Sequence, residues 1–302
     1  MNSIAFRLGV DLGGTKITAI VLDAEGVEIC RERIPTPQHD YAGTLQAVAG
    51  LVAGLETRVG EQCTVGIGMP GSVSRASGLV KNSNSVCLNG QPVHHDLETL
   101  LDRPLRFAND ADCFALSEAS DGAALDAGVV FGVIIGTGTG AGLVANKTLL
   151  TGPNGIAGEW GHNPLPWPRP EELPGPDCYC GRAGCIETWL SGPGLARDYQ
   201  QLHGVANQAS AIVCRAAEGE LQAVATLQRY MDRMARALAS VINILDPDVI
   251  VLGGGVSNCV LLYEAVPSRW GEYVFSDRVD TRLVKAKHGD DSGVRGAAWL
   301  WC

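Results

Sequence analysis

Two segments of the chain share one pattern, and this repeat constrains the fold more than any other feature. Leu8–Ile20 and Phe131–Leu143 align without a gap, and each has a short apolar run, a glycine-rich turn and a second apolar run. The apolar runs are short and rich in β-branched residues, which predicts strands rather than helices. Each segment is therefore expected to form a strand–turn–strand hairpin. One hairpin opens each half of the chain, which predicts two domains of related topology rather than a solenoid.

Further elements are predicted between and after the hairpins. A buried strand is expected to enter a turn at 64–71, and a loop rich in Ser, Asn and Gly follows at 71–92. A strand at 104–110 ends in polar residues and is followed by a helix at 111–124. The chain is predicted to be largely helical over 209–245, to form a strand and a triple-glycine turn over 246–258, and to close with a helix in the tail.

The composition excludes several classes of protein. The 302 residues predict two domains of ordinary size, and 46% hydrophobic with 19% charged residues is typical of a globular protein with a large core. A net charge of −10 without a dense Lys/Arg tract argues against nucleic acid or an anionic membrane as a partner. No apolar run approaches the ~20 residues that span a bilayer, and no secretory signal is visible. A cytoplasmic protein is expected.

Glycine-rich turns after strands are candidates for phosphate binding, because successive backbone N–H groups can converge on phosphate oxygens. A single such turn is more often only a tight turn, but three of them at strand ends favour phosphate. The P-loop spacing is absent, and a strand follows each hairpin turn, unlike a dinucleotide fingerprint. Asp11 ends the first strand and could hold Mg²⁺ through water. The candidates in the two hairpins are Gly13, Gly14, Thr15, Lys16, Gly136, Thr137, Gly138, Thr139 and Gly140.

One imidazole and three thiols form a candidate metal site. His162, Cys178, Cys180 and Cys185 supply a complete tetrahedral ligand set, which predicts a closed, structural Zn²⁺ site rather than a catalytic one. A chance group of buried thiols is the alternative. One nitrogen of His162 would bind the metal and the other would be free to donate outward. The remaining cysteines are expected to be reduced and mostly buried: Cys30, Cys63, Cys87, Cys113, Cys214, Cys259 and Cys302.

Four polar residues are candidates for a small-molecule site. Glu159 and Glu187 flank the metal ligands, so a metal that fixes this loop would also fix both carboxylates. Either one alone is most often a surface residue. Asn109 and Asp110 end a predicted strand, where ligands bind in many α/β proteins. The alternative is that one of them only caps the helix that follows.

The motifs together resemble the ROK group (repressors, open reading frames, kinases) of the actin/hexokinase-like ATPase superfamily. The similarity covers essentially the whole chain. It rests on DLGGTK at 11–16, GIGMPG at 66–71, AND at 108–110, GTGTGAG at 136–142, GEWGH at 158–162, CYCGRAGCIE at 178–187 and DPDVIVLGGG at 246–255. Within the group, the segments 81–92, 161–167 and 286–301 look most like bacterial fructokinases that also accept mannose.

The resemblance implies a two-domain α/β fold of the actin/hexokinase-like (ribonuclease H-like) type with an interdomain cleft, and a homodimer. The smaller domain would comprise 1–115 and 290–302, and the larger one 116–289. ATP and Mg²⁺ would bind the glycine hairpins, with Gly254 and Gly255 near the adenosine. Asp110 would be the catalytic base. Sugar contacts would come from Asn84, Asn109, Glu159, His162 and Glu187, although Cys87 replaces a Trp that the family usually has near Asn84.

The expected reaction is therefore transfer of the γ-phosphoryl group of ATP to the 6-hydroxyl of D-fructose, with mannose or glucose as further acceptors. The alternatives are an N-acetylglucosamine kinase and a glucokinase of the same family, which share most of the hydroxyl-binding residues. A sugar-responsive transcriptional repressor is a remote alternative. Repressors of the family carry a helix-turn-helix domain before the first glycine motif, and Asp11 leaves no room for one.

Overall fold

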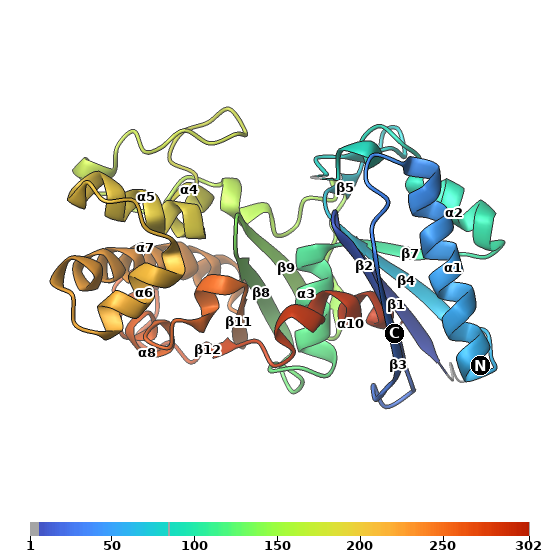
Figure 1. The fold of residues 1–302 in the computed structure, drawn as a ribbon. Helices are drawn as coiled ribbons and strands as arrows, with labels where there is room; N and C mark the ends of the chain where they lie inside the picture. Colours follow the sequence, from blue (N-terminus) through green and yellow to red (C-terminus); the bar gives the residue numbers. More distant parts are fainter. Residues whose placement is uncertain (1–5, 84, 302) are drawn as a thin grey trace. The chain divides into compact units, whose positions relative to one another are not determined.

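The computed structural model describes residues 6–83 and 85–301, which form two compact units (Figure 1). The first comprises Met1–Leu125, Lys147–Ala157 and Asp290–Cys302, and the second comprises Asp126–Asn146 and Gly158–Gly289. The domain boundary expected after residue 115 would cut through helix α3 (Asp110–Ser120). The whole of α3 belongs to the first unit, because it packs along the C-terminal helix α10 (Ser292–Trp299) of the same unit.

The first unit is built on a five-stranded mixed sheet with the order β3-β2-β1-β4-β7. Its strands are β1 (Arg7–Leu12), β2 (Lys16–Leu22), β3 (Glu28–Pro35), β4 (Thr64–Met69) and β7 (Arg106–Asn109). The strands β1 and β2 pair antiparallel, which confirms the first predicted hairpin. Because β4 and β7 run parallel to β1, the carboxyl ends of these three strands lie at one edge of the sheet.

Helices cover both faces of this first sheet (Figure 1). Leu8 and Val10 of β1 join a core with α1 (Tyr41–Val59) and α2 (Val93–Leu101). Gly9 lies between them and faces the other side, where a Cβ atom would lie 2.1 Å from the carbonyl oxygen of Val294 in α10. The strand backbone and α10 are thus in direct contact, which a side chain at this position would prevent. The segment 71–92 contains β5 (Ser72–Val73), β6 (Val80–Lys81) and the 3₁₀ turn η1 (Val86–Leu88).

The second unit repeats the same strand–turn–strand arrangement. β8 (Val129–Ile135) and β9 (Thr139–Ala145) pair antiparallel, which confirms the second predicted hairpin. β11 (Val249–Gly253) runs parallel to β8, and β12 (Arg282–Lys285) runs parallel to β11. The short strand β10 (Thr148–Leu149) follows β9 in the chain.

The helices of the second unit pack mainly around α7, whose side chains share a core with Phe131, Val133 and Ile135 of β8. None of the helices in the described part of the chain is long and apolar enough to cross a membrane. The α-helices are α4 (Ile186–Leu190), α5 (Gly192–His203), α6 (Ala209–Ala217), α7 (Leu221–Leu245), α8 (Leu262–Ala265) and α9 (Pro267–Trp270). The 3₁₀ turns are η2 (Glu159–His162), η3 (Pro170–Glu172), η4 (Gly255–Asn258) and η5 (Gly289–Asp291).

Candidate active site

The turn between β1 and β2 presents two unpaired backbone amides. The N–H of Gly13 donates to the carbonyl of Lys16 at 3.1 Å, which closes the turn. The hydroxyl of Thr36 donates to the carbonyl of Gly13 at 2.7 Å. The amides of Gly14 and Thr15 have no hydrogen-bond partner among the described residues. Successive free N–H groups beside the exposed Lys16 form a suitable cradle for an anionic group.

The turn between β8 and β9 presents two free amides at the equivalent positions. The N–H of Gly136 donates to the carbonyl of Gly138 at 3.0 Å. Thr137 and Gly138 have no amide partner within residues 6–83 and 85–301, and they align with Gly14 and Thr15 of the first hairpin. The amide of Thr139 is already bound, because it donates to the carboxylate of Glu187 at 2.9 Å. Two free amides remain here for an anion.

The third glycine turn lies beside the second one. Gly254 has φ 81°, and a Cβ atom on it would lie 2.4 Å from the carbonyl oxygen of Ile135, the last residue of β8. Only glycine can make this close approach with a left-handed backbone. Gly254 and Gly255 are therefore exposed at the same end of the sheet as the second turn. Gly140 lies outside the turn, because it is a β9 residue paired with Ile134.

Two carboxylates meet at the carboxyl edge of the first sheet. Asp11 is in β1, and Asp110 follows β7 as the first residue of α3. Burial, and then the charge of Asp110, raise the pKa of Asp11 to about 6, while Lys16 and Arg33 act in the opposite direction. Desolvation also raises the pKa of Asp110. Paired carboxylates with raised pKa values are suited to binding a divalent cation or accepting a proton.

Asn109 does cap α3, as the alternative interpretation predicts. Its side-chain oxygen accepts the N–H of Asp112 at 2.6 Å. This bond leaves the amide nitrogen of Asn109 without a hydrogen-bond partner among the described residues, so the cap and a ligand contact are compatible. Asp110 is exposed, with one oxygen accepting the N–H of Ala111 at 3.0 Å. Asn84 lies outside the described residues.

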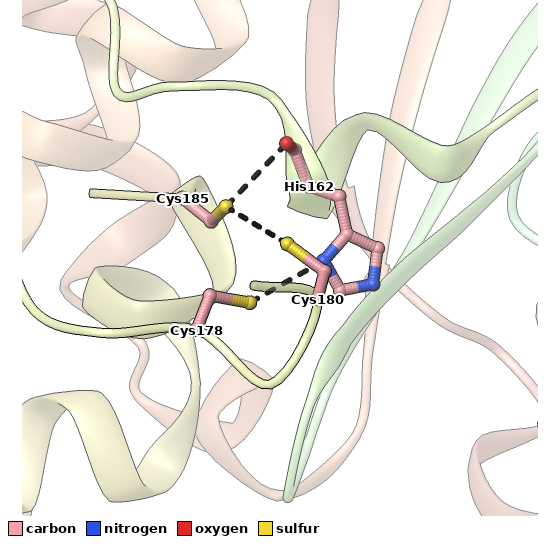
Figure 2. A group of neighbouring side chains, drawn as sticks. All are labelled: His162, Cys178, Cys180 and Cys185. Atoms are coloured by element: carbon pink, nitrogen blue, oxygen red, sulfur yellow. Dashed lines mark hydrogen bonds between the residues drawn. The ribbon is translucent and has the colours of Figure 1, made fainter. Parts of the chain in front are cut away.

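The four predicted metal ligands come together in the second unit (Figure 2). Their ligand atoms all lie within 4.8 Å of one another. Cys178 Sγ lies 3.6 Å from Nδ1 of His162, and Cys180 Sγ lies 3.6 Å from Cys185 Sγ. Tetrahedral Zn²⁺ with bonds of about 2.3 Å would hold thiolates about 3.8 Å apart. The cysteines are free rather than disulfide-bonded, so this donor set fits zinc.

Tyr179 corrects the prediction that His162 has a free outward nitrogen. The Tyr179 hydroxyl lies 2.9 Å from Nε2 of His162, and the two rings meet edge to face with centroids 5.1 Å apart. Sequence reasoning missed this residue, whose position between Cys178 and Cys180 was the available signal. Tyr179 is 82% exposed. A ligand hydroxyl would therefore have to replace a solvent-exposed partner rather than a buried one.

The two flanking carboxylates stand on different elements. Glu159 opens η2 and is exposed, and its side chain makes no hydrogen bond or ion pair with the described residues. Glu187 lies in the first turn of α4 and is half-buried. The element η2 packs closely on β9, because a Cβ atom on Gly161 would lie 2.2 Å from the carbonyl oxygen of Thr139. Glu187 is therefore held against the second glycine turn by its hydrogen bond with the Thr139 amide, while Glu159 lies in the same 3₁₀ turn as His162.

A buried ionic network anchors the irregular loop that precedes Cys178. Glu172 is bound by Arg233 and Arg236, each at 2.8 Å. Although burial alone would raise the pKa of Glu172, the hydrogen bonds from Arg236, the Arg169 amide and Arg233 lower it to about 2. Arg236 also donates to the carbonyl of Trp167 at 2.8 Å, a bulky residue held at φ 45°. Removing either partner would leave a buried charge unpaired.

Comparison with known proteins agrees with this arrangement. The pattern of the ROK family matches residues 7–302. The chain is 41% identical over 296 residues to an N-acetyl-D-glucosamine kinase of Vibrio cholerae serotype O1, covering 97% of this chain and 98% of the relative. A ROK hexokinase from Thermus thermophilus has a TM-score of 0.87 and 30% identity, covering 98% and 97% of the two chains. A ROK family glucokinase from Streptomyces griseus, in complex with glucose and AMPPNP, has a TM-score of 0.75 and 27% identity, covering 98% of each chain. The hexokinase-like α/β fold expected from the sequence is confirmed.

Asp11 makes the stability of the ligand-free protein depend on pH. Its pKa is about 6 in the folded chain against an ordinary value of 3.8, so the folded state favours the protonated form. The resulting stability is present below 3.8 and is lost as the pH rises through about 6. Asp11→Asn removes this loss, and we expect the variant to exceed the wild type at neutral pH by about 1–3 kcal/mol in free energy of unfolding.

Urea unfolding between acidic and neutral pH, without divalent cations, measures this effect as the difference between the two proteins. Asp102→Asn is the matched control, since Asp102 is an exposed carboxylate of the same unit with a left-handed backbone that Asn tolerates. The control should keep the wild-type pH dependence. An Asp11→Asn curve parallel to that of the wild type would show that Asp11 titrates normally.

Loss of one metal ligand tests the zinc site. Cys180→Ser should reduce the zinc content from about one ion per chain, lower the melting temperature and raise KM for the acceptor, because the ion ties the loop to η2 and α4. Cys214→Ser is the control, since Cys214 is also exposed but lies outside the cluster. Elemental analysis and thermal melts provide the readout. Equal zinc content in the two variants would contradict the assignment.

Proposed function

Because this chain belongs to the ROK family and is an ATP-dependent sugar kinase, we propose that it phosphorylates the 6-hydroxyl of a hexose, with N-acetyl-D-glucosamine as the acceptor. The observation that carries the choice of acceptor is the Vibrio cholerae relative, which matches this chain over nearly its whole length. The expectation of D-fructose is not confirmed by the comparisons, which favour the alternative of an N-acetylglucosamine kinase.

The paired free amides of the glycine turns are proposed to bind the phosphates of ATP. Gly14 and Thr15 offer one pair, and Thr137 and Gly138 offer the other. Lys16 adds a positive charge beside the first pair. Asp11 would hold Mg²⁺, which neutralises charge on the transferring phosphoryl group. Gly254 and Gly255 would accept the adenosine, since the third turn lies against the end of β8.

Asp110 is proposed as the base that takes the proton from the attacking hydroxyl. Its raised pKa makes the carboxylate a better proton acceptor than an ordinary Asp. It is accessible, and the cap formed by Asn109 fixes the start of the helix that carries it. Phosphoryl transfer requires mainly positioning and charge neutralisation, so one correctly placed base is sufficient side-chain chemistry.

The sugar is proposed to bind through its hydroxyls to polar side chains at five positions. Asn84 and the amide group of Asn109 would contribute, as would Glu159, Glu187 and Nε2 of His162, with the sugar taking the place of the Tyr179 hydroxyl. Carboxylates and an imidazole are suited to this role because a carboxylate accepts hydrogen bonds from sugar hydroxyls, while an imidazole nitrogen can donate or accept one.

D-Fructose is the second candidate acceptor, on the strength of one specific observation. The segments 81–92 and 161–167 resemble those of bacterial fructokinases, and both segments belong to the proposed sugar-binding part of the chain. Cys87, where the family usually has Trp, makes this part of the chain less bulky. Glucose and mannose are expected to be weaker acceptors.

The acceptor is tested by coupled ADP release with Mg·ATP across N-acetyl-D-glucosamine, D-fructose, mannose, glucose and N-acetylmannosamine. We expect N-acetyl-D-glucosamine to give the highest kcat/KM. A higher value for fructose would keep the kinase chemistry and replace the acceptor with the second candidate. No turnover of any hexose by zinc-replete protein would overturn the proposed function.

The base is tested with Asp110→Asn, which keeps the size of the side chain and removes its ability to take a proton. We expect kcat to fall by about 10²–10⁴-fold, the usual contribution of a general base. Binding of the acceptor, measured by calorimetry, should stay close to that of the wild type. Asp112→Asn, which makes the same change two residues along the same helix, is the control variant. Equal turnover in Asp110→Asn and wild type would rule out Asp110 as the base.

A further inference from the structure

We propose that Glu187 positions the nucleotide as well as the sugar, with one carboxylate oxygen holding the second glycine turn and the other reserved for a sugar hydroxyl. This inference rests on the proposed kinase function and extends it. The residue would thus join the phosphate-binding and sugar-binding parts of the second unit through a single side chain.

The carboxylate of Glu187 lies directly against the turn. Its Oε2 atom accepts the N–H of Thr139 at 2.9 Å. A Cβ atom on Gly138 would lie 2.5 Å from the same oxygen, so the carboxylate occupies the space where other residues carry a side chain. Thr139 is only 4% exposed. Its amide would lose a buried hydrogen bond if the carboxylate were removed.

The two hairpin turns are closed differently, and the difference explains the need for a carboxylate. In the first turn, the Gly13 amide reaches the carbonyl of Lys16, three residues along. In the second, the Gly136 amide reaches Gly138, only two residues along. This tighter closure leaves the next amide, that of Thr139, to a partner outside the hairpin, and Glu187 is that partner. The Glu187 side chain therefore helps to orient the unpaired amides of Thr137 and Gly138 in the second turn.

A backbone contact from the same region holds the other end of the turn. Glu187 lies in the first turn of α4, and its carbonyl accepts the N–H of Ser191, the residue that follows α4. The next amide, that of Gly192, donates to the carbonyl of Gly136 at 2.8 Å. The segment from Glu187 to Gly192 therefore holds the turn at both its first and last residues. A displacement of Glu187 would be transmitted to the amides between them.

The second oxygen of Glu187 is available to a ligand. Oε1 has no hydrogen-bond partner in the described part of the chain, and the side chain is half-buried rather than enclosed. A carboxylate has acceptor sites on both oxygens, so it can hold an amide and a sugar hydroxyl together. Glu159 has no contact with the turn that the structure records, which makes it the matched comparison.

The test measures nucleotide binding without sugar, by calorimetric titration with Mg·ADP and a non-hydrolysable ATP analogue. Glu187→Ala should weaken nucleotide binding about 5–100-fold, the equivalent of one lost buried hydrogen bond. Glu187→Gln should stay within about twofold of the wild type, because its carbonyl oxygen can accept the same N–H. Glu159→Ala should also stay within twofold, although both alanine variants should raise KM for the sugar.

Gly138→Ala gives an independent variant that keeps every carboxylate. Its methyl group would meet Oε2 of Glu187 and push the carboxylate off the turn, so nucleotide binding should weaken as in Glu187→Ala. Wild-type nucleotide affinity in zinc-replete Glu187→Ala would overturn the inference, as would an equal loss in Glu159→Ala. If the wild-type protein binds no nucleotide, the proposed kinase function itself is wrong, and the inference about Glu187 is wrong with it.

Discussion

Both units depend on one constraint: a buried antiparallel hairpin must reverse direction through a short turn whose middle amides stay unpaired. The strands are held by the hydrogen-bond ladder and by core packing, so the turn itself need not contribute to stability. The amides of Gly14 and Thr15 in one turn, and of Thr137 and Gly138 in the other, have no partner among the described residues and are then available to an anion. A rigid hairpin with unpaired amides is pre-organised for phosphate, because little order is lost on binding.

In the second unit, many of the buried polar contacts hold the irregular loop that precedes Cys178. A loop without a hydrogen-bond ladder has to be fixed by side chains. The buried pairs of Glu172 with Arg233 and Arg236 fix its middle, and the four candidate metal ligands lie together at its end. Arg233 also stacks on Trp189 of α4 at 4.4 Å, so the network extends to the helix that carries Glu187. The functional carboxylates therefore rest on a scaffold that is itself highly charged.

Several residues serve structure and function at once. Asn109 caps α3 with its oxygen and keeps its amide nitrogen available. Glu187 holds a backbone amide with one oxygen and leaves the other accessible. His162 presents Nδ1 to the thiols and Nε2 to Tyr179. In each case a side chain with two polar atoms uses one to fix its own direction, which limits the rotamer freedom that a ligand would otherwise have to restrict.

The sequence by itself determined both hairpins, the glycine turns, a helix cap at Asn109 or Asp110 and the grouping of the four candidate metal ligands, because strand periodicity, turn chemistry and ligand spacing are local properties. Only the tertiary structure decided what depends on distant parts of the chain. Tyr179 occupies the nitrogen of His162 that was expected to be free, and Glu187 takes the Thr139 amide that was expected to face phosphate. The whole of α3 belongs to the first unit through its packing on α10. The first two contacts join residues 17 and 48 positions apart, and α3 and α10 are more than 170 positions apart, so no local pattern could reveal them; they follow from how the elements pack.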